Sequence, residues 1–314
     1  MGSVASFGSI NVDRVAYLDR ETVDGLAARY DWFPAPGETR RVERVPEAVE
    51  SHVRETFLGG KGANQAVAAA RADADSALYG MVGGDADAFD VRPSLAGYGV
   101  DVGAVETADA PTGTAYVFVD EAGENHIALV GGANAAVGTE YVHRTVGALR
   151  SADCLLVQNE LPGATLEALL DALEGPGGPL VVFDPAPVDG AADLLDHGCI
   201  DVVTPNETEA AALGDRLSAL DATVVRTRGA EPVVVDPGGP FAGERFTVTP
   251  PPADPVDTTG AGDVFAGYLA AELADGRALE PALACACGAA ARSTEREGVQ
   301  RATPARDAVP ACGE

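Results

Sequence analysis

The sequence predicts an α/β fold in which helices cover both faces of a mostly parallel sheet. The main observation is that short apolar, β-branched runs alternate with Ala- and Leu-rich amphipathic runs along the chain. A chain of 314 residues with 46% hydrophobic residues can bury one large core of this kind. No internal repeat or low-complexity linker divides the sequence, so we expect a single domain over residues 1–314.

The elements follow this alternation in order. We expect strands at residues 4–7, 77–82, 154–158, 180–184, 201–204 and 223–226, and helices at 63–72, 166–173, 207–213, 261–274 and 278–293. Two stretches depart from it: residues 12–58 are charged and Pro-rich with little periodicity, and residues 114–119 and 126–130 form a hairpin pattern around a turn at 120–125. They predict a small β extension, with lid segments at approximately residues 12–58 and 110–131.

Composition excludes several partners. The formal net charge is −28, and a phosphate backbone or an anionic membrane surface requires patches of Lys and Arg. We therefore expect neither nucleic acid nor a membrane as a partner. The acidity has two explanations, a high-salt cytoplasm or codon bias; codon bias accounts for the scarcity of lysine but not for the shortage of Arg relative to Asp and Glu, which favours high salt.

Targeting and redox signals are weak. The amino-terminal residues carry no signal-peptide pattern, and no apolar run approaches the ~20 residues of a membrane span. The five cysteines fit no zinc-binding spacing, so we expect buried free thiols in a reducing cytoplasm.

The stretch DTTGAGD, residues 257–263, precedes the helix expected at 261–274. Unpaired N–H groups at a helix N-terminus bind anions, and Gly260 and Gly262 leave that backbone bare. Asp263 would repel a phosphate there, which makes sense if it accepts a proton from an attacking hydroxyl. The alternative is an aspartate that only complements the helix dipole, beside glycines that only form a turn.

The stretch GGKGAN, residues 59–64, contains Lys61, the only lysine of the chain, and leads into another helix. It is not a Walker A motif, because Gly62 stands where that motif has Ser or Thr. A solvated lysine in a loop is the alternative, although elsewhere in this chain such a residue is arginine. Arginine is bulky and planar, whereas lysine is a slim donor that fits between glycines.

Three further stretches carry polar groups. In TPNETEA, Asn206 and Glu209 are three residues apart and suit a hydrated Mg²⁺, or form a helix cap, or both. In QNELP, Glu160 follows a strand at the edge where α/β sheets bind ligands. In GSINVD, Asn11 and Asp13 follow another strand and suit sugar hydroxyls, with turn residues as the alternative.

Together GGKGAN and DTTGAGD resemble the two signatures of the ribokinase family, the PfkB-type carbohydrate kinases. GSINVD, TGTAYVFVDEAGENHIALVGGANAAV, NELP, FDPAPV and TPNETEA extend the resemblance over nearly the whole chain. The family implies a three-layer sandwich with a mostly parallel central sheet and a small β-sheet lid. It also implies transfer of the ATP γ-phosphoryl group to a sugar hydroxymethyl, with D-ribose as the expected substrate, Mg²⁺ and K⁺ as cofactors, and a homodimer formed through the lid.

The resemblance also implies roles for particular positions. Asp263 corresponds to the catalytic base, and the backbone that forms the anion hole is that of Gly260, Ala261 and Gly262. The implied sugar-binding residues are Asn11, Asp13, Gly60, Lys61, Asn64 and Glu160; Asn206 and Glu209 organise Mg²⁺ through water; and Thr227 and Gly229 belong to the nucleotide loop. The implied monovalent-cation residues are Asp257, Thr259, Gly298 and Ala302, beside Glu297.

Three departures from the family pattern stand out. The first is that residues 14–58 are longer than the usual lid segment. The second concerns the nucleotide side, where the chain between Glu209 and Thr227 is shorter by about a helix and Pro232 stands where a glycine is expected. The third lies just after Asp263. Val264 and Ala266 replace polar residues. The first bears on lid shape and the second on nucleotide preference. Other sugars, a nucleoside or a catalytically silent sugar-binding role stay open as alternatives. A Rossmann dehydrogenase is disfavoured, because no G-x-G-x-x-G follows the first strand.

Overall fold

The structure is a computed structural model that describes residues 1–312. Its main body is built on a nine-stranded sheet in the order β14-β13-β12-β11-β10-β9-β1-β5-β6. Neighbours from β6 to β12 are parallel, while β13 and β14 at the edge are antiparallel. The strands are β1 (Ser3–Phe7), β5 (Asp75–Val82), β6 (Val105–Thr107), β9 (Cys154–Gln158), β10 (Leu180–Asp184), β11 (Val202–Val203), β12 (Thr223–Arg228), β13 (Glu231–Asp236) and β14 (Phe246–Val248).

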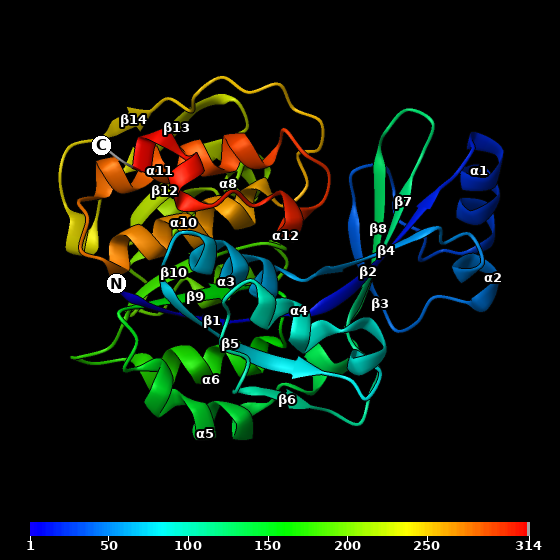
Figure 1. Cartoon of the computed structure of the whole chain (residues 1–314), viewed down its shortest axis with the longest axis horizontal. Coiled ribbons are helices and arrows are strands. Elements are labelled where there is room, and N and C mark those ends of the chain that lie inside the picture. Colours follow the sequence, from blue (N-terminus) through cyan, green and yellow to red (C-terminus); the bar gives the residue numbers. More distant parts are fainter. Residues whose placement is uncertain (313–314) are drawn as a thin grey trace.

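Helices cover both faces of this sheet, because successive strand residues point to opposite sides. On one face Val4, Leu156 and Val182 pack against α3, α10 and α11; on the other Phe7 and Leu155 pack against α5 and α6. Figure 1 shows these layers. The helices are α1 (Arg20–Arg29), α2 (Glu47–Glu50), α3 (Lys61–Arg71), α4 (Val91–Gly97), α5 (Thr139–Leu149), α6 (Gly163–Leu173), α7 (Ala191–Leu194), α8 (Glu207–Leu213), α9 (Asp215–Ser218), α10 (Ala261–Ala274), α11 (Leu279–Ser293) and α12 (Val299–Ala302).

A second sheet of five strands stands beside the main body (Figure 1) in the order β3-β8-β7-β2-β4. Its strands are β2 (Asn11–Tyr17), β3 (Thr39–Val42), β4 (Glu55–Gly59), β7 (Thr114–Val119) and β8 (Asn125–Val130). The expected hairpin is confirmed as β7 and β8, which pair antiparallel. The stretch expected at residues 12–58 contributes the other three strands together with α1 and α2. Apolar residues of these two helices pack on one face of the small sheet.

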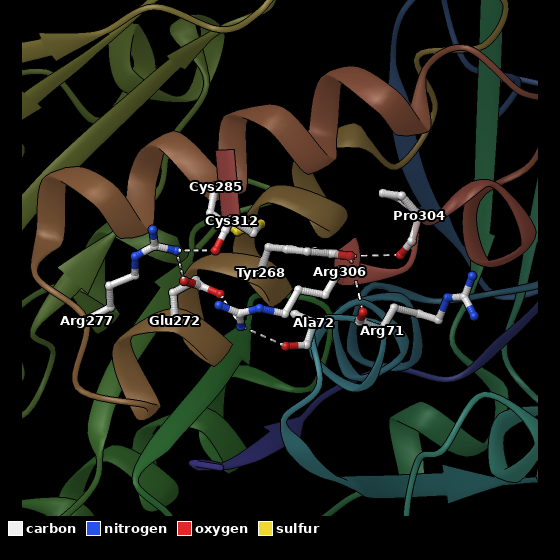
Figure 2. The surroundings of a disulfide bond; sticks show 9 residues. All are labelled: Arg71, Ala72, Tyr268, Glu272, Arg277, Cys285, Pro304, Arg306 and Cys312. Carbon is white, nitrogen blue, oxygen red and sulfur yellow. Dashed lines mark hydrogen bonds and ion pairs between the residues drawn. A yellow bond between two sulfur atoms is a disulfide. The ribbon is translucent and has the colours of Figure 1, made fainter. Parts of the chain in front are cut away.

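The expectation that all cysteines are free thiols is wrong for one pair. Cys285 and Cys312 form a disulfide, whereas Cys154, Cys199 and Cys287 are free. The bond joins α11 to a short turn 27 residues later, a separation that matches no spacing pattern, so only the packing reveals it. Glu272 lies beside it (Figure 2). Its side chain is 1% exposed and forms salt bridges with Arg277 at 2.6 Å and Arg306 at 2.5 Å. These two ion pairs and the disulfide together anchor the last turns of the described chain.

Within residues 1–312, no helix combines the length and the apolar character needed to cross a bilayer.

Candidate active site

Asp263 lies in the first turn of α10, near the carboxyl ends of the central strands. Gly260 caps this helix at φ +71°, and a side chain at Gly260 would overlap Val299, so both the backbone conformation and the packing require glycine. Asp263 is 5% exposed, and its carboxylate accepts bonds from Asn64 Nδ2 at 3.0 Å and Gln65 Nε2 at 3.1 Å. Two amides of α3 therefore hold the carboxylate in one orientation.

The first turn of α10 offers donors beside this carboxylate. A helix leaves its first N–H groups without an intrahelical partner. Within residues 1–312, no backbone or side-chain acceptor is found for the N–H groups of Gly262 and Asp263. A methyl group at Gly262 would meet nothing within 4 Å, so this backbone is open. Free N–H groups next to a fixed carboxylate can stabilise anionic oxygens while the carboxylate accepts a proton.

Lys61 is the first residue of α3 and reaches the same point. Its Nζ lies 3.1 Å from Asp184 Oδ2 and 3.5 Å from Asp263 Oδ1. Gly60, the residue before it, has φ +88°, and a Cβ there would lie 2.7 Å from the backbone of Asn11. The slim loop predicted around Lys61 is thus present, but the ammonium pairs with two carboxylates in this structure.

Burial and charge act in opposite directions on these groups. Burial disfavours the charge of Lys61, but the carboxylates of Asp184, Asp263 and Glu160 outweigh it and hold the Lys61 pKa well above its ordinary value. Burial raises the pKa of Asp263, Lys61 lowers it, and Asp184 raises it further. Asp263 is therefore a stronger base than a solvated aspartate.

Asp13 and Glu160 form a second acidic pair. Burial and the neighbouring Glu160 charge raise the pKa of Asp13 from 3.8 to about 7, and Asp13 Oδ1 has no hydrogen-bond partner among the described residues. Glu160 accepts bonds from the Ser9 hydroxyl and, at 3.2 Å, from the Lys61 backbone N–H. A side chain at Gly59 would overlap the Asp13 carboxylate. An unpaired buried oxygen suits a ligand that brings a donor.

Asn11 is 3% exposed and sits where β2 leaves the main body. Its Oδ1 accepts a 2.8 Å bond from Asn134 Nδ2, and Asn134 also binds both backbone groups of Ile10. Asn11 is therefore fixed by the segment that follows β8 and lies close to Gly60.

The predicted cap at the start of α8 is confirmed. Asn206 Oδ1 accepts from the Glu209 N–H at 2.9 Å, and Glu209 Oε2 accepts from the Asn206 N–H at 2.9 Å. Burial raises the pKa of Glu209. Asn206 also bridges to Thr227 at the end of β12, so the structure brings the predicted nucleotide loop, with Gly229 at φ +57°, next to this cap. Each carboxylate oxygen keeps a lone pair, which suits a water of a hydrated Mg²⁺.

Two loops meet beside the start of α10. Asp257 Oδ1 accepts from the Thr259 N–H at 2.9 Å, and Asp257 Oδ2 accepts from the Gly298 N–H at 3.0 Å. These bonds lower the pKa of Asp257 against the effect of burial. Ala302 ends α12 and is buried. An ionised carboxylate between two loops is the type of oxygen donor that a monovalent cation needs, so the residues present fit the ion.

Sequence reasoning missed several residues of the site, namely Ser9, Gln65, Asn134, Gln158, Asp184 and Gln300. Gln300 Nε2 bonds Asn64 Oδ1 at 3.1 Å and so orients the amide that holds Asp263. Asp184 ends a strand that the sequence predicts correctly, and that position at the ligand-binding edge of the sheet was the available signal.

The comparisons with known proteins agree with this arrangement. The family description "pfkB family carbohydrate kinase" matches residues 37–306. A ribokinase from Haemophilus influenzae is 33% identical, over 95% of this chain and 94% of its own. An ATP-dependent ribose-1-phosphate kinase from Halopiger xanaduensis is 36% identical, over 87% of this chain and 93% of its own. A bifunctional ribokinase/ribose-5-phosphate isomerase A from Fructilactobacillus sanfranciscensis is 34% identical over 98% of this chain, which spans 56% of that protein's length.

Solved structures give the same result. The ribokinase of Thermotoga maritima superposes with a TM-score of 0.78 at 29% identity, covering 99% of each chain. The Arabidopsis thaliana ribokinase complexed with ribose and ATP superposes with a TM-score of 0.75 at 26% identity, covering 99% of this chain and 98% of that one. The expected α/β fold with a mostly parallel main sheet is confirmed.

Proposed function

Because this chain belongs to the pfkB family of carbohydrate kinases, we propose that it transfers the γ-phosphoryl group of ATP to the 5-hydroxyl of D-ribose. The observation that carries the proposal is the buried Asp263 carboxylate beside the open N–H groups of α10. In the proposed step Asp263 accepts the hydroxyl proton while these N–H groups stabilise the charge of the moving phosphoryl group.

The sugar would lie between β2 and the start of α3. Asp13 Oδ1 lacks a partner and can accept a sugar hydroxyl, and Glu160 lies beside it. We assign sugar binding also to Asn11, Gly60, Lys61 and Asn64. Lys61 then has to share its ammonium between the sugar and the two carboxylates that hold it now.

Two cations complete the proposal. Asn206 and Glu209 would hold the water shell of Mg²⁺, which supplies positive charge near the phosphates when bound. Thr227 and Gly229 would line the nucleotide loop next to them. The cation site of Asp257, Thr259, Gly298 and Ala302 would take K⁺ and fix the start of α10.

Asp263→Asn tests the base. The variant keeps the size of the side chain but cannot accept the proton, so turnover should fall by about 10²–10⁴-fold while sugar affinity changes little. Asp201→Asn is the matched control, because Asp201 accepts a bond from the Val181 N–H away from this site. Near-normal turnover of Asp263→Asn would remove Asp263 from the reaction.

A substrate panel tests the acceptor. We expect kcat/KM to be highest for D-ribose, lower for 2-deoxyribose and fructose, and lowest for adenosine, because a missing hydroxyl leaves Asp13 unpaired. Fructose or adenosine outperforming ribose would overturn the ribose assignment and leave the kinase assignment intact.

A second candidate acceptor is ribose 1-phosphate, the substrate named for the Halopiger xanaduensis relative. Arg41 on β3 favours it. Its guanidinium donates to the carbonyls of Asn159 at 2.8 Å and Glu160 at 3.3 Å, and no carboxylate within residues 1–312 forms a salt bridge with it. An unpaired guanidinium beside Glu160 can bind a phosphate on the sugar, because it retains free N–H donors.

Arg41→Gln separates the two acceptors. If ribose 1-phosphate is the substrate, the variant should lose activity on it by at least tenfold and keep activity on ribose. Equal losses on both would assign Arg41 to holding β3 on the main body.

We further propose that the five-stranded sheet is the lid and that the enzyme acts in the cytoplasm, where ATP is made.

The homodimer expected through the lid stays a prediction. Residues of α1 and α2 already cover one face of that sheet, and Leu18, Phe33 and Val49 of α2 are buried in the same apolar cluster, which favours a lid that is complete within one chain. Light scattering of the purified protein decides between a dimer and a monomer.

A further inference from the structure

We propose that Asp184 is a positioning residue for phosphoryl transfer: it draws Lys61 away from Asp263 and orients Gln65 toward it. The inference rests on the proposed function, because it gives Asp263 the role of base. Asp184 itself is not placed in contact with the sugar or the phosphates.

The contacts of Asp184 leave it little freedom. It is the last residue of β10 and 6% exposed. Oδ2 accepts from Lys61 Nζ at 3.1 Å and from Gln65 Nε2 at 2.8 Å, while Oδ1 accepts from the Ala186 N–H at 3.0 Å. Gln65 is held at its other end by Gln158 Nε2 at 2.7 Å, and Gln158 is the residue paired with Asp184 in the sheet. The sheet register therefore fixes the amide that touches Asp263.

One ammonium serves two buried carboxylates here. Lys61 Nζ is closer to Asp184, at 3.1 Å, than to Asp263, at 3.5 Å. Without the charge on Asp184, Lys61 would pair with Asp263 alone. A carboxylate paired exclusively with a buried ammonium is a weaker base, because the pair stabilises its ionised form.

The other groups around Asp263 do not replace Asp184. Asn64 and Gln65 contribute neutral amides. Glu160 and Asp13 contribute charge from a greater distance, and Glu209 acts on Asp184 from the side of α8. The balance at Asp263 is therefore set by Lys61 and Asp184, in agreement with the opposite directions in which they move its pKa.

Asp184→Asn tests this role, because it removes the charge and keeps the size and the bond from Ala186. We expect kcat at pH 7 to fall about tenfold, the acid limb of the kcat–pH profile to move to lower pH, and the KM for the sugar to change little. Asp201→Asn should leave the profile unmoved. A lower kcat with an unmoved acid limb would make Asp184 merely structural and overturn the proposal, as would unchanged kinetics.

Two further measurements keep the test decisive. Gln65→Leu removes the Gln65 contact but retains the Asp184 charge. Because the hydrogen bond from Gln65 lowers the pKa of Asp263, this variant should move the acid limb to higher pH, opposite to the shift of Asp184→Asn. A limb that moves to lower pH contradicts the proposal even if Asp184→Asn does not fold. In a Lys61→Met background, adding Asp184→Asn should shift the limb less than in the parent protein, because only the direct repulsion between the two carboxylates remains; a shift as large as in the parent protein contradicts a role through Lys61. Asp263→Asn measured in parallel separates the failures, because full activity there refutes the proposed function itself.

Discussion

Asp13→Asn should stabilise the fold while it damages sugar use. The carboxylate of Asp13 is crowded by Glu160 and has one oxygen without a partner, so its charge is costly in the folded protein. The neutral amide has the same shape and keeps an oxygen that can face the backbone N–H of Ala115, whose proximity lowers the pKa of Asp13. The change therefore removes a buried charge without creating a cavity.

The structure sets the magnitude. The Asp13 pKa rises from 3.8 to about 7 on folding, and each pKa unit is worth 1.36 kcal/mol, which gives an upper limit of about 4 kcal/mol. Because the folded state binds the proton more tightly, the native protein loses this stability as pH rises from 3.8 to about 7. The gain from Asp13→Asn should therefore be near zero at pH 4 and reach its plateau above pH 7.

Urea unfolding of both proteins at several pH values, at constant molar KCl, measures this gain. Initial rates with ribose should show the opposite effect, a kcat/KM reduced by about 5- to 150-fold, since a hydroxyl loses a charged acceptor worth ~1–3 kcal/mol. For the native protein, the KM for ribose should rise as pH falls below about 7, because Asp13 becomes protonated. A gain in stability that does not depend on pH, or a loss at every pH, would refute the reasoning.

Three further outcomes are expected. Gly260→Ala should abolish turnover and destabilise the start of α10, because Gly260 has φ +71° and a Cβ there would overlap Val299. Gly262→Ala should fold normally, because a Cβ at Gly262 would meet nothing within 4 Å. Equal thermal midpoints for the two variants would contradict this difference. Cys312→Ser should lower the free energy of unfolding by about 3–4 kcal/mol, because the bond to Cys285 closes a loop of 27 residues and restricts the unfolded chain. A reductant should lower the stability of the parent protein and leave that of the variant unchanged. The thermal midpoint of the protein should rise from dilute buffer to molar KCl, because salt screens the repulsion within a net charge of −28. NaCl should protect the fold equally but restore less activity than KCl. A midpoint that does not depend on salt would favour codon bias as the cause of the acidic composition.

The sequence predicts the main sheet well because its elements are locally consistent. The strands at 154–158 and 180–184 and the helix at 207–213 have the predicted bounds, since continuous apolar runs and a capping pattern mark them. Helix α1 was not predicted: none of its residues is fully buried, and only the partly buried Val23 and Leu26 pack on the apolar cluster of the small sheet, which no local pattern predicts.

The residues of the site divide in the same way into those that a local sequence pattern identifies and those that only the fold brings together. GGKGAN and DTTGAGD identify Lys61 and Asp263 because glycines and helix starts leave a readable pattern. Asp184 was missed because it is one of 49 acidic residues, and only the parallel pairing of β9 with β10 brings it to Lys61. Gln300 is 236 residues from Asn64 in sequence, so no spacing could connect them.

Four chain segments join the two sheets: β1 to β2, β4 to α3, β6 to β7, and the exit from β8. They are tied together, since Asn11 bridges to Gly113 and accepts a bond from Asn134. Residues assigned to the sugar, Asn11 and Lys61, lie on these connections, so any rotation of the small sheet also rearranges the pocket. If the small sheet closes over the sugar as the proposed lid, the measured affinity is the intrinsic affinity multiplied by the fraction of molecules already closed. A substitution that stiffens these connections in the closed form would then tighten binding without touching the ligand.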